Sequence, residues 1–166
     1  MSIIRVLEPA DEAAYKRLWG EGLRTLAAFF RTAPEDDPDG RIPTRYTEDS
    51  FTLGAFAGTA LIGIVSLERD RGRKLSHKAL LFRMLVAPAW GRAGVGRALL
   101  EAAIGKATAV GDLRQIHLTV LATNERARRL YQAMGFQEFA CEPEAIKIGA
   151  AYVAEIRMVR FLTPRS

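Results

Sequence analysis

The stretch LFRMLVAPAWGRAGVGRALL, residues 81–100, decides the fold because it joins a buried strand to a helix through a glycine-rich turn. Residues 79–86 are nearly all apolar, which is typical of a central strand covered on both faces. Pro88 ends that run, and residues 96–110 follow with helical character. The start of such a helix presents unpaired N–H groups and a partial positive charge. The turn therefore favours a phosphate group, which glycines let approach the backbone closely at positions 91, 94 and 96.

Two familiar phosphate-binding turns do not fit this stretch. A nucleoside-triphosphate loop needs Gly-Lys-Ser/Thr, whereas Gly96 is followed by Arg97 and Ala98, which supply no hydroxyl for Mg²⁺. A dinucleotide fold has its glycine motif after the first strand and an acid about 20 residues later. Here the motif follows the fourth expected strand, and the next strand ends in Leu121. By itself the turn also suits an ordinary helix start, so a second motif is needed.

That second motif is LTVLATNERARRLYQAMGFQEF, residues 118–139. A strand ends, Asn124 lies near the N-cap of the next helix, and Tyr131 follows seven residues later. Seven residues are about two helical turns, so both side chains lie on one side of the helix. Taken alone, Asn124 is a capping residue and Tyr131 a core aromatic.

The remaining hydrophobic periodicity completes the order β, α, β, β, β, α, β, α, β, β. The first helix spans about 11–31, and Gly20 and Gly22 are candidates for dividing it in two. Gly58-Thr59 predicts a two-residue hairpin. This order mixes hairpins with β-α-β crossovers, which predicts a mixed sheet with helices on both faces. The expected strands are 3–7, 51–57, 60–68, 79–86, 115–121, 136–141 and 152–161.

Bulk properties limit the classes of function. The chain has 166 residues, 49% of them hydrophobic, which fits one domain spanning 1–166. It has no apolar run of about 18 residues for a membrane span and no secretory signal, and its one cysteine, Cys141, cannot form an internal disulfide. We therefore expect a cytoplasmic protein with no membrane partner, and we interpret Cys141 as a small packing residue.

The charge pattern and the histidines exclude two further classes. The net charge is +5, yet no aromatic residues interleave with the basic clusters, so nucleic-acid binding rests on charge alone and is not expected. His77 and His117 lie far apart in the sequence, with no cysteine or acidic partner at ligand spacing. No metal is expected.

Together the two motifs resemble the GNAT acyltransferase superfamily over essentially residues 3–162. The resemblance rests on LVAP, on AGVGRALL, and on N-x-x-A-x-x-L-Y-x-x-x-G-F at 124–136. The segment CEPEAIKIGAAYVAEIRM, 141–158, resembles one bacterial branch. The resemblance implies an α/β (α+β) fold, a single GNAT-like domain with a central mixed, mostly antiparallel sheet of six to seven strands. It also implies an N-acetyltransferase that uses acetyl-CoA.

The resemblance further implies a set of site residues. Backbone groups of Met84, Leu85 and Val86 would pair with the pantetheine arm, Asn124 would contact that arm, and Tyr131 would protonate the departing thiolate. Amides of the turn would bind the diphosphate. The family usually has Arg or Gln where this chain has Gly91, and we expect Arg92 to compensate. The turn residues are Gly91, Arg92, Ala93, Gly94, Val95, Gly96 and Arg97.

The acceptor amine and the general base stay open. The base is His77, Glu68, Glu155 or a water chain. The acceptor belongs to a peptide N-terminus, a lysine, a polyamine, an amino acid or an aminoglycoside. An acidic loop mildly favours a cationic acceptor, and a homodimer also stays open. The rival function is a non-catalytic acyl-CoA-binding or regulatory module, which would not need the phenol of Tyr131. The acidic loop contains Glu35, Asp36, Asp37 and Asp39.

Overall fold

The computed structural model describes residues 2–162, which form one seven-stranded sheet in the order β1-β2-β3-β4-β5-β7-β6. Among the described strands, β4 and β5 form the one parallel pair and all other neighbours are antiparallel. The expected mixed, mostly antiparallel sheet is confirmed. The strands are β1 (Ile3–Val6), β2 (Ser50–Ala57), β3 (Ala60–Arg69), β4 (Lys78–Val86), β5 (Gln115–Leu121), β6 (Gln137–Ile148) and β7 (Ala151–Phe161).

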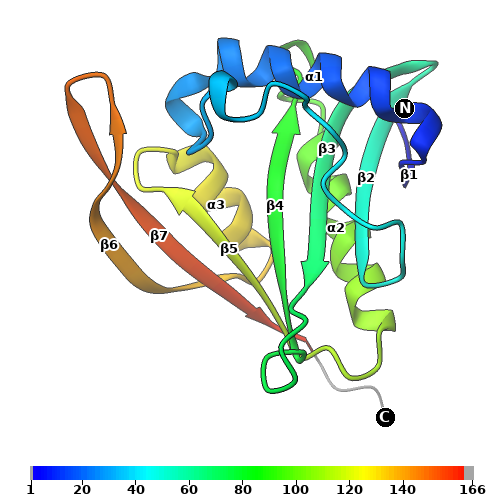
Figure 1. Cartoon of the computed structure of the whole chain (residues 1–166). Helices are drawn as coiled ribbons and strands as arrows, with labels where there is room; N and C mark the ends of the chain where they lie inside the picture. Colours follow the sequence, from blue (N-terminus) through cyan, green and yellow to red (C-terminus); the bar gives the residue numbers. More distant parts are fainter. Residues whose placement is uncertain (1, 163–166) are drawn as a thin grey trace.

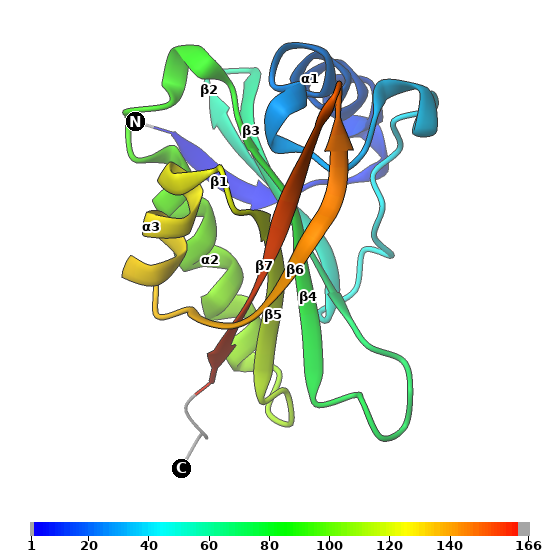
Figure 2. The same cartoon turned by 90° about the vertical axis from the view of Figure 1, so that its left-hand side faces the viewer.

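Helices cover both faces of the sheet, as expected (Figures 1 and 2). Helix α1 (Glu12–Thr25) packs on one face, and α2 (Val95–Ala109) and α3 (Glu125–Ala133) pack on the other. The core is correspondingly divided into two clusters of buried side chains. Short 3₁₀ turns lie at η1 (Pro9–Asp11), η2 (Ala27–Phe29), η3 (Pro34–Asp36) and η4 (Pro88–Trp90). Within residues 2–162, no helix combines the length and the apolar character that crossing a membrane requires.

Helix α1 is continuous through its two glycines and ends at Thr25, so the suggested division at Gly20 and Gly22 is wrong. Gly22 is needed for packing instead. A Cβ added there would lie 2.6 Å from Leu85 Cδ2, because α1 crosses β4 at this point. The glycine therefore lets the helix backbone approach the central strand closely.

Strand β4 is less covered than its apolar sequence predicts. Leu80 is 46% exposed, although it pairs with His117 of β5. A bulge also interrupts its pairing with β3: Arg83 and Met84 lie opposite the single residue Val65. Arg83 has φ of 50°, a left-handed conformation that is uncommon for a residue other than glycine. The central strand is thus bent and partly open.

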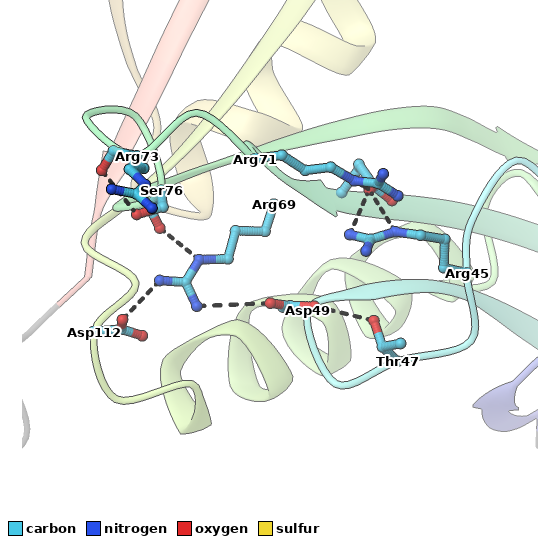
Figure 3. A network of polar contacts seen from close by, with 9 residues as sticks. Arg45, Thr47, Asp49, Arg69, Arg71, Arg73, Ser76 and Asp112 are labelled. Carbon is cyan, nitrogen blue, oxygen red and sulfur yellow. Dashed lines mark hydrogen bonds and ion pairs between the residues drawn. The ribbon is translucent and has the colours of Figure 1, made fainter.

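The end of β4 away from the glycine turn is held by a network of charged side chains (Figure 3). Arg69 donates a hydrogen bond to the Ser76 carbonyl, and it pairs with Asp112 at 2.8 Å and with Asp49 at 3.6 Å. This network joins the β2, β3 and β5 ends of the sheet to the loop that precedes β4. It anchors the loop that the sequence shows only as a basic stretch.

Strands β6 and β7 form a long hairpin whose outer strand is mostly exposed. The sequence predicts a strand only over 136–141, and the strand in fact extends to Ile148. Cys141 is exposed, so its interpretation as a packing residue is wrong. The physical reason is that β6 is an edge strand, paired with β7 alone.

Candidate functional site

A cavity of about 1000 Å³ lies where β4 and β5 separate. The two strands pair only between Lys78–Leu80 and Gln115–His117, and Figure 1 shows them diverging from that end. Both strands line the cavity beyond the pairing, over Leu80–Val86 and Leu118–Leu121. Residues from the segment after α1 line it as well, as do residues of the glycine turn and α3. Because those segments cover opposite faces of the sheet, the cavity connects the two faces.

The wall formed by β4 exposes backbone to the cavity. Leu85 and Val86 pair with Ile64 and Gly63 of β3 on one side. On the other side, no described residue of β5 pairs with β4 beyond Leu80. The free backbone groups of this edge can pair with an extended ligand as an added strand would. Met84, Leu85 and Val86, which the sequence singles out, all line the cavity.

The glycine turn closes one end of the cavity. Gly94 is the N-cap of α2 with φ of 76°, so the turn needs a residue without a Cβ there. Gly91, Gly94, Gly96 and Arg97 line the cavity. Arg92 and Ala93 are exposed and lie outside its lining, and Val95 is buried in the core. The roles of the turn's amides and of Arg92 stay predictions.

Helix α3 contributes both residues of the second motif to the cavity. Asn124 is the N-cap, and its Oδ1 accepts a hydrogen bond of 3.3 Å from the Ala127 amide. Tyr131 is buried and packs edge-on against Phe136, with ring centroids 5.9 Å apart. Both residues also line the cavity. The structural and functional interpretations of Asn124 and Tyr131 are therefore compatible.

The protonation state of the Tyr131 hydroxyl follows from its burial. It makes no hydrogen bond to any other described residue, and Tyr131 lines the cavity. Burial raises the pKa of Tyr131 above its ordinary value of 10.0, because the charged phenolate would lose its hydration. The phenol therefore stays protonated at neutral pH.

Among the three candidate bases, only Glu155 lines the cavity. It lies on β7 opposite Leu121, and its side chain is 6% exposed. Its one ion-pair partner among the described residues is Arg31, with Nε 3.6 Å from Oε2. Such a carboxylate is incompletely compensated and can accept a proton or hold an ammonium group.

Glu68 and His77 lie outside the cavity. Glu68 is engaged at the far end of β4, where it accepts hydrogen bonds from Arg45 and from the Ser50 hydroxyl. His77 immediately precedes β4, at the end of the strand opposite the glycine turn. Neither side chain is positioned to receive a proton from a substrate in the cavity.

The two histidines, although separated in sequence, lie on neighbouring strand ends. Burial lowers the pKa of His117, and the charges of Lys78 and His77 lower it further. Within the described residues, no group of three or more His, Cys, Asp or Glu side chains is arranged to hold a metal ion.

An arginine–aromatic cluster, which sequence reasoning missed, forms part of the wall. The Arg83 guanidinium donates a hydrogen bond of 3.1 Å to the Tyr15 hydroxyl, lies 3.0 Å from Asp37 Oδ2, and stacks 4.7 Å from the Trp19 ring centroid. Trp19 Nε1 donates to the same Asp37 oxygen at 2.9 Å. The available signal was Arg83 itself, a charge within an apolar strand.

The acidic loop, which the sequence also allows as an ordinary solvated loop, does not line the cavity. Asp37 is paired with Arg83, and Asp39 lines a separate shallow hollow with Glu12 and Lys16. None of the four loop acids lines the cavity. Leu26, Phe29, Phe30 and Arg31 line it instead, from the segment that follows α1. The expected helix over about 11–31 therefore ends early, at Thr25.

Comparison with known proteins defines the class. The chain matches the model of the acetyltransferase (GNAT) family over residues 19–136. The chain belongs to this family. Its membership supports acetyl transfer as its general activity. N-alpha-acetyltransferase 40 of Saccharomyces cerevisiae is 38% identical over 96 residues, which are 53% of this chain but only 34% of that relative.

Solved structures agree with this assignment. A GCN5-related N-acetyltransferase from Kribbella flavida superposes with a TM-score of 0.83 at 28% identity, covering 97% of this chain and 98% of that one. The protein yncA of Salmonella typhimurium, solved with its cofactor acetyl-CoA, has a TM-score of 0.85 at 19% identity, covering 100% and 96%. The predicted GNAT-like fold is confirmed.

Proposed function

We propose that this chain transfers an acetyl group from acetyl-CoA to a primary amine by direct attack in a ternary complex. The observation that carries the proposal is that Tyr131 and Glu155 line one cavity, together with the free edge of β4 and the glycine turn. A protonated phenol and a buried carboxylate are the acid and the base that aminolysis of a thioester needs.

The cofactor would occupy the α2–α3 side of the cavity. Backbone groups of Met84, Leu85 and Val86 would pair with the pantetheine arm, since no described residue of β5 pairs with β4 beyond Leu80. Asn124 would contact the same arm from the start of α3. The amides of residues 91–97 would bind the diphosphate, because the start of α2 has unpaired N–H groups and a partial positive charge.

Proton transfers complete the reaction. Glu155 takes a proton from the ammonium group of the acceptor, whose lone pair then attacks the thioester carbonyl carbon. The nitrogen of the tetrahedral intermediate still carries a positive charge and loses its second proton to solvent. The C–S bond then breaks as the intermediate collapses, and Tyr131 gives its proton to the departing thiolate. The amide product and free CoA result. Solvent then restores the proton of Tyr131 and removes that of Glu155.

The acceptor would enter from the side of the sheet that α1 covers. Leu26, Phe29 and Phe30 line this part of the cavity with Glu155 and Arg31. We therefore propose an amine attached to an apolar group, with its ammonium group on Glu155. A polycation would fit this part of the cavity less well, because it would meet a single carboxylate among apolar side chains.

We also propose that residues 1–166 act as one cytoplasmic domain, although residues 1 and 163–166 lie outside the described part of the chain. The presence of a single cysteine supports the location.

A panel of amines, assayed for free CoA thiol, tests the proposal. We expect acetyl-CoA-dependent release with an apolar primary amine, and a large loss of kcat/KM in Glu155→Gln. Acetyl-CoA at 100 times its Kd should also stabilise the protein by about 2.7 kcal/mol, a melting shift of several degrees. Stabilisation without transfer to any amine would favour the binding module. No stabilisation at millimolar acetyl-CoA would reject the proposal.

A further inference from the structure

Gly91 is a glycine for a reason other than its backbone conformation. Its φ of −63° and ψ of −19° are helical values that any residue adopts. A Cβ at this position would lie 3.3 Å from Arg126 Nη1, 3.5 Å from Nη2, and 3.3 Å from the Pro88 carbonyl oxygen. Arg126 Nη2 donates a hydrogen bond to the Gly91 carbonyl. The glycine thus leaves room for a guanidinium group that comes from α3.

The charge of Arg126 has no carboxylate partner among the described residues. The other arginines of α2 and α3 differ: Arg97 lies 3.1 Å from Glu101, Arg128 lies 2.8 Å from Glu138, and Arg129 lies 3.3 Å from Glu125. Arg126 is therefore a cation in the glycine-turn region whose charge the fold itself leaves uncompensated.

The position of Arg126 in its helix also disfavours a cation. It lies in the first turn of α3, where the helix dipole is positive and acidic side chains are preferred. The side chain nevertheless turns toward Gly91 and lines the cavity between the glycine turn and Asn124. An anion bound there would relieve the repulsion from the dipole and the lack of a counter-charge together.

We propose that Arg126 binds the diphosphate of acetyl-CoA and that Gly91 exists to admit it. The inference rests on the proposed function, because it assigns a residue to the cofactor of that reaction. Guanidinium has five N–H donors in a planar fork, and the Gly91 carbonyl uses one. The others remain for phosphate oxygens, which the amides of the turn bind from the opposite side.

Isothermal titration of Arg126→Ala with acetyl-CoA tests the assignment. We expect the Kd to rise about tenfold to a hundredfold, since a charge-assisted contact is lost. Arg129→Ala is the matched control: it removes the same charge from the same helix, and its Kd should stay within about twofold of wild type. Arg126→Gln, which keeps most of the stem, repeats the test if the alanine variant melts early.

Truncated cofactors locate the contact. The loss in Arg126→Ala should persist with acetyl-dephospho-CoA, which keeps the diphosphate, and should vanish with S-acetylpantetheine, which has no phosphate. If the loss vanishes already with acetyl-dephospho-CoA, Arg126 binds the 3′-phosphate and the assignment to the diphosphate is wrong.

A second-site variant tests whether an arginine at position 91 can replace Arg126. In the Arg126→Ala background, Gly91→Arg would deliver a guanidinium to the same space and should recover most of the affinity. In wild type, Gly91→Arg should give no gain, because the space is occupied. If wild type binds acetyl-CoA and Arg126→Ala binds equally well, the inference fails while the proposed function stands. If wild type does not bind acetyl-CoA, both fail.

Discussion

The charged residues near the two ends of strand β4 differ in how fully they are paired. At the end before Lys78, Arg69 is paired with Asp49 and Asp112 and bonded to the Ser76 carbonyl (Figure 3). At the cavity end, Arg126 has no carboxylate partner among the described residues, and Glu155 has one at 3.6 Å.

This difference separates charges that hold the fold from charges that are available to a ligand. A charge already surrounded by hydrogen-bonding partners has little more to gain from a ligand. A charge that is buried or placed against a helix dipole without full compensation gains free energy when a complementary ligand arrives. The pairing state therefore predicts which variants change function and which change stability.

The largest expected effect is at the glycine turn. Gly96→Asp should abolish acetyl-CoA binding, because its carboxylate would stand at the cavity wall where the diphosphate is expected. A Cβ there would meet the flexible end of Met84 at 3.1 Å, and the side chains of Leu130 and Val86 at 3.4 and 3.7 Å, so the fold should survive. Gly94 is a poorer choice, since its φ of 76° would add backbone strain.

Gly105→Asp is the matched control for this change. It places the same charge in α2, where a Cβ meets no atom within 4 Å. Titration calorimetry should find binding in Gly105→Asp and none in Gly96→Asp. Normal binding by a folded Gly96→Asp protein would place the diphosphate elsewhere.

Tyr131→Phe should lower kcat by roughly two orders of magnitude, because general-acid contributions are typically 10²–10⁴-fold. The ring keeps its contact with Phe136, so acetyl-CoA affinity should change little. Steady-state kinetics with chemistry rate-limiting measures the effect. Tyr46→Phe removes an exposed phenol that donates to Glu12, and it should leave kcat unchanged. An unaltered kcat in Tyr131→Phe would return Tyr131 to a packing role.

A smaller effect should appear at the paired end of β4. Arg69→Met should lower the stability by about 1–2 kcal/mol, a melting change of a few degrees, because several hydrogen bonds of one partly buried guanidinium are lost. Acetyl-CoA affinity should not change. Arg73→Met, in the loop after β3 and with no ion pair to a described residue, should melt like wild type. A change of acetyl-CoA affinity in Arg69→Met would contradict the assignment of this end of β4 to stability alone.

The smallest effect concerns pH. The folded pKa of His117 lies below its ordinary value of 6.5, so the folded protein binds this proton less readily than the unfolded chain. Its contribution to stability is therefore full above about pH 6.5 and is lost as the pH falls through the folded pKa. Titration of the imidazole signals by NMR measures the pKa, and His117→Gln should remove this part of the pH dependence. A folded-state pKa of His117 at or above 6.5 would contradict the predicted pH dependence.

Several elements of the fold and site can be read from local sequence. Strand β5 is found at its observed bounds because its apolar and polar residues alternate with the period of a half-buried strand. The order of elements and the cap at Asn124 follow from equally local patterns. Met84, Val86 and Tyr131 reach the cavity as expected, since each lies in a motif whose backbone conformation is locally determined.

Errors arise where a residue's surroundings come from distant segments. Cys141 was misplaced because edge position in a sheet depends on strand order. The role of Gly22 depends on Leu85, which is 63 residues away, and the pairing of Asp37 with Arg83 cannot be read from the acidic loop alone. The choice of Glu155 over His77 and Glu68 likewise required knowing where β4 and β5 separate.

The sequence by itself determined the order of elements, the mixed sheet and the acetyltransferase family, because these follow from periodicity and from motifs of contiguous residues. Only the tertiary structure decided which charges remain available. Pairing is a property of space: Arg69 finds Asp112 across 43 residues, and Arg126 approaches Gly91 across 35. Since charges interact over a few ångströms whatever their separation along the chain, no local pattern reveals which of them the fold neutralises.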